Sequence, residues 1–186
     1  MPDAPDLIFR PVTSANWDDF EALFETPGGP KYCWCMVWRV NASERHETRG
    51  ARRKPMMKGR IDDGVPVGLL AYKEGKPAAW VSIAPKQTHS RLGGPGPEPG
   101  ENVWSLTCMY VPRKLRGQGL AHRLIAAAVN HARAEGANIV EAYPVDPDSP
   151  SYKFMGLVPA FETAGFSDLG MAGTRRHVMR LDLRAN

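Results

Sequence analysis

The amino-acid sequence predicts a single α/β domain, and three observations support this fold class. The chain has 186 residues, which is within the usual size of one domain. Segments typical of strands and of helices alternate along it, as they do where helices pack on a sheet. A glycine-rich turn also joins an expected strand to an expected helix. We therefore expect residues 1–186 to form one domain.

Apolar patterns place the individual elements. Short apolar runs bounded by turn residues predict strands at residues 7–12, 67–72, 77–84, 103–111, 139–143 and 177–183. Apolar residues at helical spacing predict helices at residues 14–25, 120–135 and 158–164. Ser43, with Glu44 and Glu47, is expected to open a further helix near Pro55. Residues 85–100 hold four prolines and four glycines and predict a long loop.

Composition indicates an ordinary globular protein. Hydrophobic residues make up 42% of the chain and charged residues 24%. No apolar run approaches the ~20 residues of a membrane span, and the N-terminus lacks a signal-peptide pattern. The three cysteines, Cys33, Cys35 and Cys108, are odd in number, which favours reduced thiols. We expect a cytoplasmic protein without a membrane partner.

A basic run lies between Arg45 and Arg60 in a chain of net charge +4. Such a run attracts nucleic acid or another anion, and it is also typical of a solvated helix face. No aromatic residue interleaves with it, although a single-strand binder needs aromatic rings for base stacking. The solvated face is the favoured interpretation, and we expect no nucleic-acid partner.

The glycine-rich turn, RGQGLA at residues 116–121, has the properties of a phosphate-binding loop. The first N–H groups of a helix lack helical partners, and the helix dipole favours an anion beside them. The sequence contains no G-x-x-x-x-G-K-[ST] loop, and His122 stands where a dinucleotide fingerprint has its third glycine. These absences exclude two of the usual phosphate loops.

The remaining pattern is R/Q-x-x-G-x-G/A, which Arg116, Gly119 and Ala121 satisfy. Together with the preceding Tyr110-Val111-Pro112 and the later Ala164-Gly165-Phe166, it resembles the signature of the GNAT acetyltransferase superfamily. The chain is also similar to an uncharacterised bacterial branch with a Cys-Trp-Cys segment, here Cys33-Trp34-Cys35.

The resemblance implies a fold and a donor site. GNAT folds have a mixed, mostly antiparallel sheet, splayed between strands 4 and 5, with helices on both faces. Acetyl-CoA, the expected cosubstrate, enters the gap, and no metal is expected. The backbone of Met109, Tyr110 and Val111 should hold the pantetheine, and the pyrophosphate should lie on Arg116, Gly117, Gln118, Gly119, Leu120 and Ala121. A Met109 N–H would stabilise the developing oxyanion.

The resemblance also implies transfer of acetyl to an amine by direct attack in a ternary complex. The acceptor is a small-molecule or protein amine, and many relatives are homodimers. A non-catalytic acyl-CoA-binding module is the alternative, because the tyrosine that many GNAT enzymes use as acid is replaced by Phe161. Tyr152, Tyr143 or solvent is then left to protonate the thiolate.

Carboxylates are the expected bases. Glu141 and Glu101 are placed best by the expected fold, and His89 is a weaker candidate. Either carboxylate also suits a structural ion pair. Cys33, Trp34 and Trp38 lie where GNAT acceptors enter, and they either line the acceptor pocket or pack the helices on the sheet.

Overall fold

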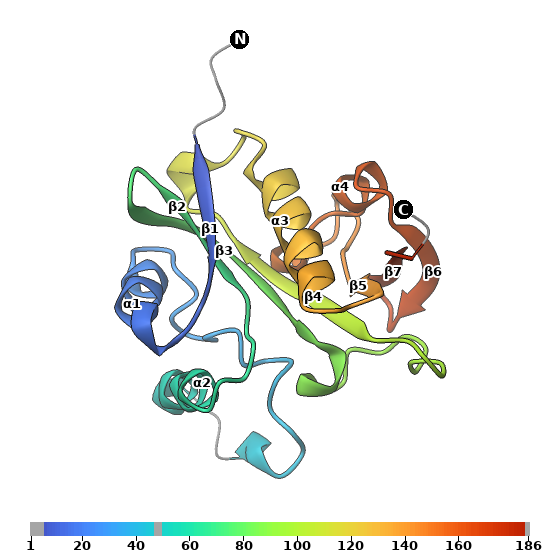
Figure 1. Cartoon of the computed structure of the whole chain (residues 1–186), viewed down its shortest axis with the longest axis horizontal. Coiled ribbons are helices and arrows are strands. Elements are labelled where there is room, and N and C mark those ends of the chain that lie inside the picture. The colour runs from blue at the N-terminus through green and yellow to red at the C-terminus, as the bar shows by residue number, and fades with distance from the viewer. Residues whose placement is uncertain (1–5, 47–49, 185–186) are drawn as a thin grey trace.

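The computed structural model describes residues 6–46 and 50–184 of the chain. Within this part, seven strands form one sheet in the order β1-β2-β3-β4-β5-β7-β6 (Figure 1). β4 and β5 are parallel, and all other neighbours are antiparallel. The strands are β1 (Leu7–Pro11), β2 (Leu69–Lys73), β3 (Lys76–Pro85), β4 (Val103–Tyr110), β5 (Ile139–Ala142), β6 (Ser167–Ala172) and β7 (Arg176–Asp182). The mixed, mostly antiparallel sheet that the sequence predicts is confirmed.

Helices cover both faces of the sheet. α1 (Trp17–Glu25) and α2 (Arg53–Asp62) lie on one face, and α3 (Leu120–Ala134) and α4 (Val158–Thr163) lie on the other (Figure 1). A separate apolar core fills each interface, one beneath α3 and α4 and one beneath α1 and α2. Among the described residues, no helix is long and apolar enough to span a membrane.

The helices follow their apolar spacing. α1 buries Trp17, Phe20, Leu23 and Phe24 on one side. α3 buries a similar stripe that starts at Leu120, and Gly136 follows its end with a φ of 87°. That left-handed conformation suits glycine because other residues are strained there.

The second helix begins later than the sequence predicts. At Ser43 the chain instead forms a local turn, in which the N–H of Glu44 donates to the Asn41 side chain at 2.9 Å. α2 begins at Arg53, and Pro55 occupies its first turn, where the missing N–H removes no helical bond. Glu47, which we expected near the start of this helix, lies outside the described residues.

Strand β6 is absent from the prediction. It lies at the edge of the sheet and pairs with β7. Five of its six residues are exposed, so its sequence carries no alternation of buried and exposed residues.

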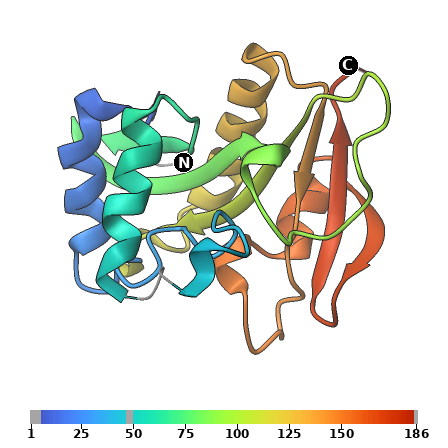
Figure 2. The same cartoon turned by 90° about the horizontal axis from the view of Figure 1, so that it is seen from below.

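The sheet opens between β4 and β5. The two strands pair from Val103 with Ile139 to Leu106 with Ala142, and β4 then continues to Tyr110 paired with β3 only. At the same point β4 bulges against β3: Ser82 pairs with Cys108 and Ile83 with Leu106, so that Thr107 is the extra residue of β4 in this ladder. A bulge bends its strand, and this one lies where β4 leaves β5. The loop of residues 86–102 crosses in front of β5 and β7 (Figure 2).

Candidate active site

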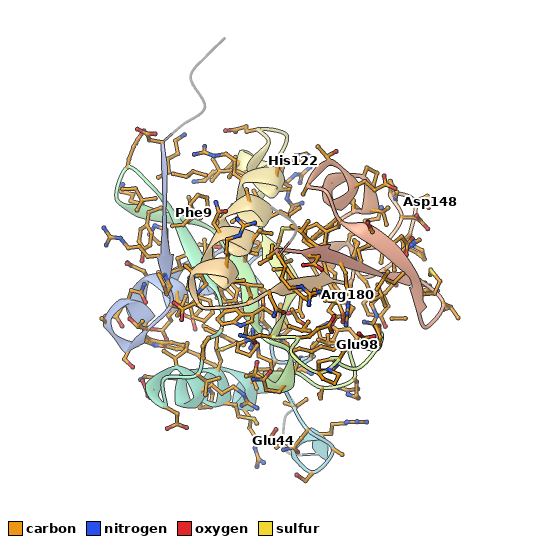
Figure 3. The ribbon with its side chains drawn as sticks, turned by 45° about the vertical axis from the view of Figure 1, so that its right-hand side comes forward. Phe9, Glu44, Glu98, His122, Asp148 and Arg180 are labelled. Atoms are coloured by element: carbon orange, nitrogen blue, oxygen red, sulfur yellow. The ribbon has the colours of Figure 1, made fainter. Side chains whose placement is uncertain are left out.

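A groove of about 620 Å³ occupies the opening beyond the last β4–β5 pair. Met109, Tyr110 and Val111 form one wall, and the chain from Lys153 to Leu157 contributes the other. The start of α3, at His122, borders the groove, whereas Arg180 of β7 lies in a different part of the sheet (Figure 3).

The edge of β4 is unpaired inside this groove. Past Leu106, no strand of the described chain pairs with β4 on the side facing β5. The backbone after Ala142 bends away, and Val145 forms a bridge to Leu157 instead. Free backbone groups at a strand edge can bind an extended ligand that carries amides.

The glycine loop closes one end of the groove. Gly117 and Gly119 have φ angles of 77° and 72°, in the left-handed region, and a Cβ on either would meet no atom within 4 Å. The backbone conformation, and not crowding, therefore requires glycine here. The side chain of Arg116 folds back and donates from Nε to the Val111 oxygen at 2.9 Å, which ties the loop to β4. The open space over the start of α3 fits an anionic group.

The opposite wall was not predicted from the sequence. Gly156, with a φ of 94°, marks the place where the two walls meet: a Cβ there would lie 2.5 Å from a ring carbon of Phe161 and 2.8 Å from Cε of Met109. A side chain at this position would displace both residues. The sequence signal that could have pointed to this wall is the isolated Gly156.

The model of the acetyltransferase (GNAT) family matches residues 14–156, which include β4, the glycine loop and most of the second wall. The chain belongs to the GNAT family. No curated protein matches it in sequence.

Solved structures share the GNAT fold. A ribosomal-protein-alanine N-acetyltransferase from Brucella melitensis is 20% identical, with a TM-score of 0.56 over 95% of this chain and 99% of its own. An N-acetyltransferase from Staphylococcus aureus Mu50 is 13% identical, with a TM-score of 0.55 over 96% and 99%. The PaiA N-acetyltransferase from Thermoplasma acidophilum, solved in complex with coenzyme A, is 10% identical, with a TM-score of 0.55 over 95% and 99%.

Phe161 of this GNAT chain is fully buried behind the groove. Its ring packs edge-to-face on Phe166, with centroids 5.2 Å apart. It has no proton to donate, and its apolar surroundings suit a phenyl ring.

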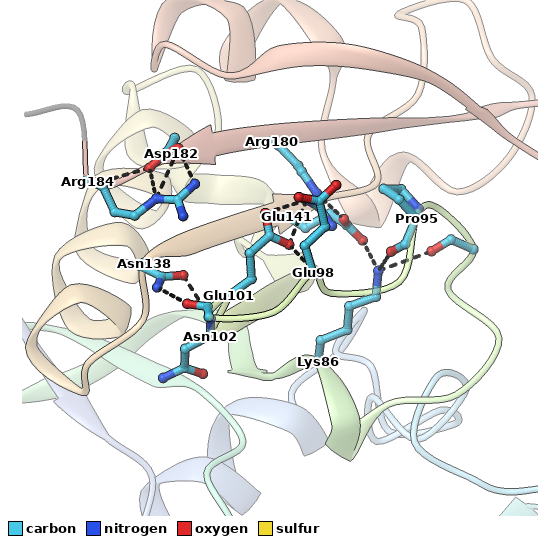
Figure 4. A network of polar contacts seen from close by, with 12 residues as sticks. Lys86, Pro95, Glu98, Glu101, Asn102, Asn138, Glu141, Arg180, Asp182 and Arg184 are labelled. Atoms are coloured by element: carbon cyan, nitrogen blue, oxygen red, sulfur yellow. Dashed lines mark hydrogen bonds and ion pairs between the residues drawn. The ribbon is translucent and has the colours of Figure 1, made fainter.

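Glu141 lies at the centre of a buried polar network and is itself fully buried (Figure 4). Its carboxylate accepts from Lys86 Nζ at 2.6 Å, from Arg180 Nε at 2.7 Å and from the Tyr143 hydroxyl. Burial, together with the adjacent Glu141 charge, raises the pKa of Tyr143, so that this hydroxyl stays protonated. Both carboxylate oxygens are thus occupied by donors of the protein, a geometry that favours a structural role.

Glu101 joins the same network from the other side of Arg180, at 3.2 Å from Nη1. A hydrogen bond from the Glu98 N–H and the Arg180 charge lower the pKa of Glu101. The loop of residues 86–102 is packed tightly over the network, because Lys86 also donates to the Pro95 oxygen at 2.8 Å. A Cβ at Gly94 would lie 3.2 Å from Oε1 of Glu141.

Tyr152 lies between the groove and a cluster of aromatic rings. Its ring centroid is 6.1 Å from that of Phe154, which lines the groove, and 6.2 Å from that of Trp38. Its φ of 62° is in the left-handed region, which costs a non-glycine residue about 1 kcal/mol or more. In contrast to Tyr143, its hydroxyl makes no hydrogen bond to the described residues.

The structure separates the three residues expected at the acceptor pocket. Trp34 is buried in the core beneath α1 and stacks on Trp17, with centroids 5.6 Å apart. Cys33 donates to the Pro30 oxygen, whereas Trp38 belongs to the cluster with Tyr152. None of the three is among the residues that line the groove, and only Trp38 packs on Tyr152, the neighbour of Phe154 in the groove wall.

His89 packs against β4 near the opening, with Nε2 3.4 Å from Thr107 Oγ1. Burial, and then the nearby Arg39 charge, lower the pKa of His89 well below its usual value. The ring is neutral at pH 7 and a weak base. Among residues 6–46 and 50–184, no group of His, Cys, Asp and Glu side chains has the arrangement of a metal site.

Proposed function

We propose that the chain is an N-acetyltransferase that transfers the acetyl group of acetyl-CoA to an amine by direct attack in a ternary complex. Membership of the GNAT family supports acetyl transfer in general. The observation that carries the proposal is the groove, in which an unpaired edge of β4 leads to the glycine loop at the start of α3.

Each wall of the groove has a binding role in this proposal. The backbone of Met109, Tyr110 and Val111 pairs with the pantetheine amides, as an added strand would. The N–H groups of Gly117, Gln118, Gly119, Leu120 and Ala121 bind the pyrophosphate, while Arg116 keeps the loop on β4. Acetyl-CoA supplies the acetyl group as a thioester, and a backbone N–H at Met109 polarises its carbonyl.

Tyr152 is the proposed acid. The amine nitrogen forms a bond to the carbonyl carbon, the carbon–sulfur bond breaks, and the Tyr152 hydroxyl gives its proton to the departing sulfur. The amine gives up its own proton to water, Tyr152 regains a proton from water, and the product is the amide with free CoA. The uncommitted hydroxyl of Tyr152, close to the wall that contains Phe154, supports this assignment over Tyr143, which donates to Glu141.

No base of the protein is assigned, because the donors around Glu141 occupy both of its oxygens. The acceptor must then react as a free amine, whose pKa is about 10.4 for a lysine-like group. We expect kcat/KM for the acceptor to rise about tenfold per pH unit up to the pKa of the amine itself. Two acceptor amines of different pKa test this expectation. If the amine itself loses the proton, the pH profiles of kcat/KM should bend at different pH values, whereas a base of the protein would make both profiles bend at the same pH.

A non-catalytic acyl-CoA-binding module is the second candidate, and the buried Phe161 at the usual acid position favours it. Release of free thiol from acetyl-CoA with a panel of amines separates the two. Turnover on any amine supports the enzyme. CoA binding without thiol release on every amine, small or protein-borne, supports the module.

A further inference from the structure

Arg176, at the start of β7, is a partly buried cation without a carboxylate partner in the described part of the chain. Its Cζ lies 4.3 Å from the ring centroid of Trp38, and 5.9 Å and 6.0 Å from those of Tyr152 and Tyr143. Nη1 donates to the Leu92 oxygen at 2.8 Å. These contacts hold the guanidinium against the rings, and within residues 6–46 and 50–184 its other N–H groups have no hydrogen-bond acceptor.

Two other cations of limited exposure on this side of the sheet have carboxylate partners, whereas among the described residues the side chain of the buried Arg39 donates only to the Val67 oxygen and to Ser82 Oγ. Lys86 pairs with Glu141, and Arg180 pairs with Glu141 and Glu101. Such pairing is usual, because removing a charge from water is costly. Burial lowers the pKa of Arg176, but an arginine remains protonated at neutral pH.

Two carboxylates contact the neighbouring residue His177. Asp168 of β6 and Asp146 accept from His177, at 2.7 Å and 3.3 Å. Burial opposes protonation of His177, but the hydrogen bonds to these two carboxylates outweigh it and raise its pKa. His177 therefore offsets part of the charge of these two carboxylates, and neither of them pairs with Arg176.

The position of Arg176 relates it to the donor groove. The short 3-10 helix Lys153–Met155 separates the two: Lys153 and Phe154 line the groove, while Met155 and Tyr152 pack in the cluster with Trp38. A molecule held at Arg176 thus lies across one turn of chain from the groove and next to Tyr152. An amine bound there is near the proposed acid.

We propose that Arg176 binds a carboxylate of the acceptor, so that the substrate is a small amine that also carries a carboxylate group. This inference rests on the proposed acetyltransferase function. A guanidinium offers two parallel N–H groups to a carboxylate, and the contact with the Trp38 ring holds the group in place. A cationic acceptor would instead have to displace Arg176 from the aromatic rings.

The test uses matched pairs of amines with and without a carboxylate: L-phenylalanine and phenethylamine, L-leucine and isoamylamine, and L-lysine and cadaverine. Free thiol release is measured with acetyl-CoA. We expect kcat/KM to be at least about tenfold higher for the carboxylated member of a pair that is turned over. Arg176→Gln should raise KM for the carboxylated member about tenfold or more and leave its kcat nearly unchanged. The kcat/KM for the amine without a carboxylate should also stay nearly unchanged. Arg176→Lys should retain part of the preference, because it keeps the charge without the planar fork.

Arg175→Gln is the matched control. Arg175 is the exposed neighbour of Arg176 and donates to Ser151 Oγ, so its loss should leave the preference intact. Melting curves of all variants exclude unfolding as the cause of a change in KM.

Two results would overturn the inference while the acetyltransferase function stands. One is turnover with equal preference for both members of each pair. The other is higher activity of Arg176→Gln on the amines that lack a carboxylate, which would indicate a cationic acceptor. If no amine is turned over, the proposed function fails, and calorimetry of the amino acids with the CoA-bound protein tests the inference alone. Binding that Arg176→Gln abolishes supports it, and absence of binding contradicts it.

Discussion

The donor groove and the Glu141 network lie on the same sheet and differ in how their polar groups are satisfied. In the network, Glu141 has donors on both oxygens, and the loop of residues 86–102 covers it. In the groove, the backbone of β4 and the N–H groups at the start of α3 face open space. A charged, buried carboxylate can thus be structural, whereas the proposed binding function belongs to a groove with few charges.

Glu141→Gln should have the largest effect on stability. It leaves the Lys86 and Arg180 charges near a neutral amide, and breaking a buried pair costs about 3–5 kcal/mol. We expect the free energy of unfolding in urea to fall by this amount. Glu101→Gln is the control: it shares Arg180 but has no bond to Lys86 or Tyr143, so it should cost less than Glu141→Gln. Equal stability of Glu141→Gln and the wild type, with lost activity, would instead assign Glu141 to catalysis.

Gly119→Glu should abolish the donor site without unfolding the protein. A carboxylate at the start of α3 occupies the place of the anion and repels it, so we expect the Kd for acetyl-CoA to rise at least about 100-fold, or ~2.7 kcal/mol. Gly119→Ala carries the same left-handed strain without the charge and should weaken binding far less. Calorimetric titration of both variants measures the difference. Retained affinity in Gly119→Glu would remove the loop from the binding site.

Tyr152→Phe should affect the chemical step. Loss of a general acid typically lowers kcat about 100-fold, and here KM for acetyl-CoA should stay nearly unchanged. Tyr143→Phe, which removes the hydroxyl bound to Glu141, should lower stability and leave kcat per folded molecule nearly intact. If Tyr152→Phe keeps full kcat, solvent protonates the leaving thiolate.

His177→Gln should have the smallest effect, and it depends on pH. The pKa of His177 is raised in the folded protein, so the stabilisation from its bonds to Asp168 and Asp146 is complete below about pH 6.5 and is lost as pH rises through the folded pKa. The melting temperatures of the wild type and the variant should therefore differ more at pH 6 than at pH 9. The same difference in melting temperature at both pH values would show that the pKa of His177 does not change when the protein unfolds.

The sequence predicts the helices and turns that are determined by residues close to one another in the chain. Apolar spacing locates α1 and α3, and Gly117 and Gly119 mark a left-handed turn before a helix. Strand β6 and the late start of α2 are not predicted, because an exposed edge strand has no apolar alternation and Ser43 bonds within a local turn.

Only one of the two walls of the candidate site can be predicted from the sequence. The β4 wall and the loop follow from a contiguous motif, whereas the wall around Gly156 depends on packing against Phe161 and Met109. The partners of Glu141 are equally hidden, because Lys86, Tyr143 and Arg180 come from three separate segments. Sequence distance carries no information about such pairing, so Glu141 resembles a base until its neighbours are known.

A crystal structure of the chain with CoA would show the donor site itself. We expect the pyrophosphate oxygens to lie about 3 Å from the N–H groups of residues 117–121 and the pantetheine to run along the edge of β4 from Met109 to Val111. CoA bound away from the opening between β4 and β5, or a glycine loop that makes no contact with phosphate, would contradict the proposed donor site.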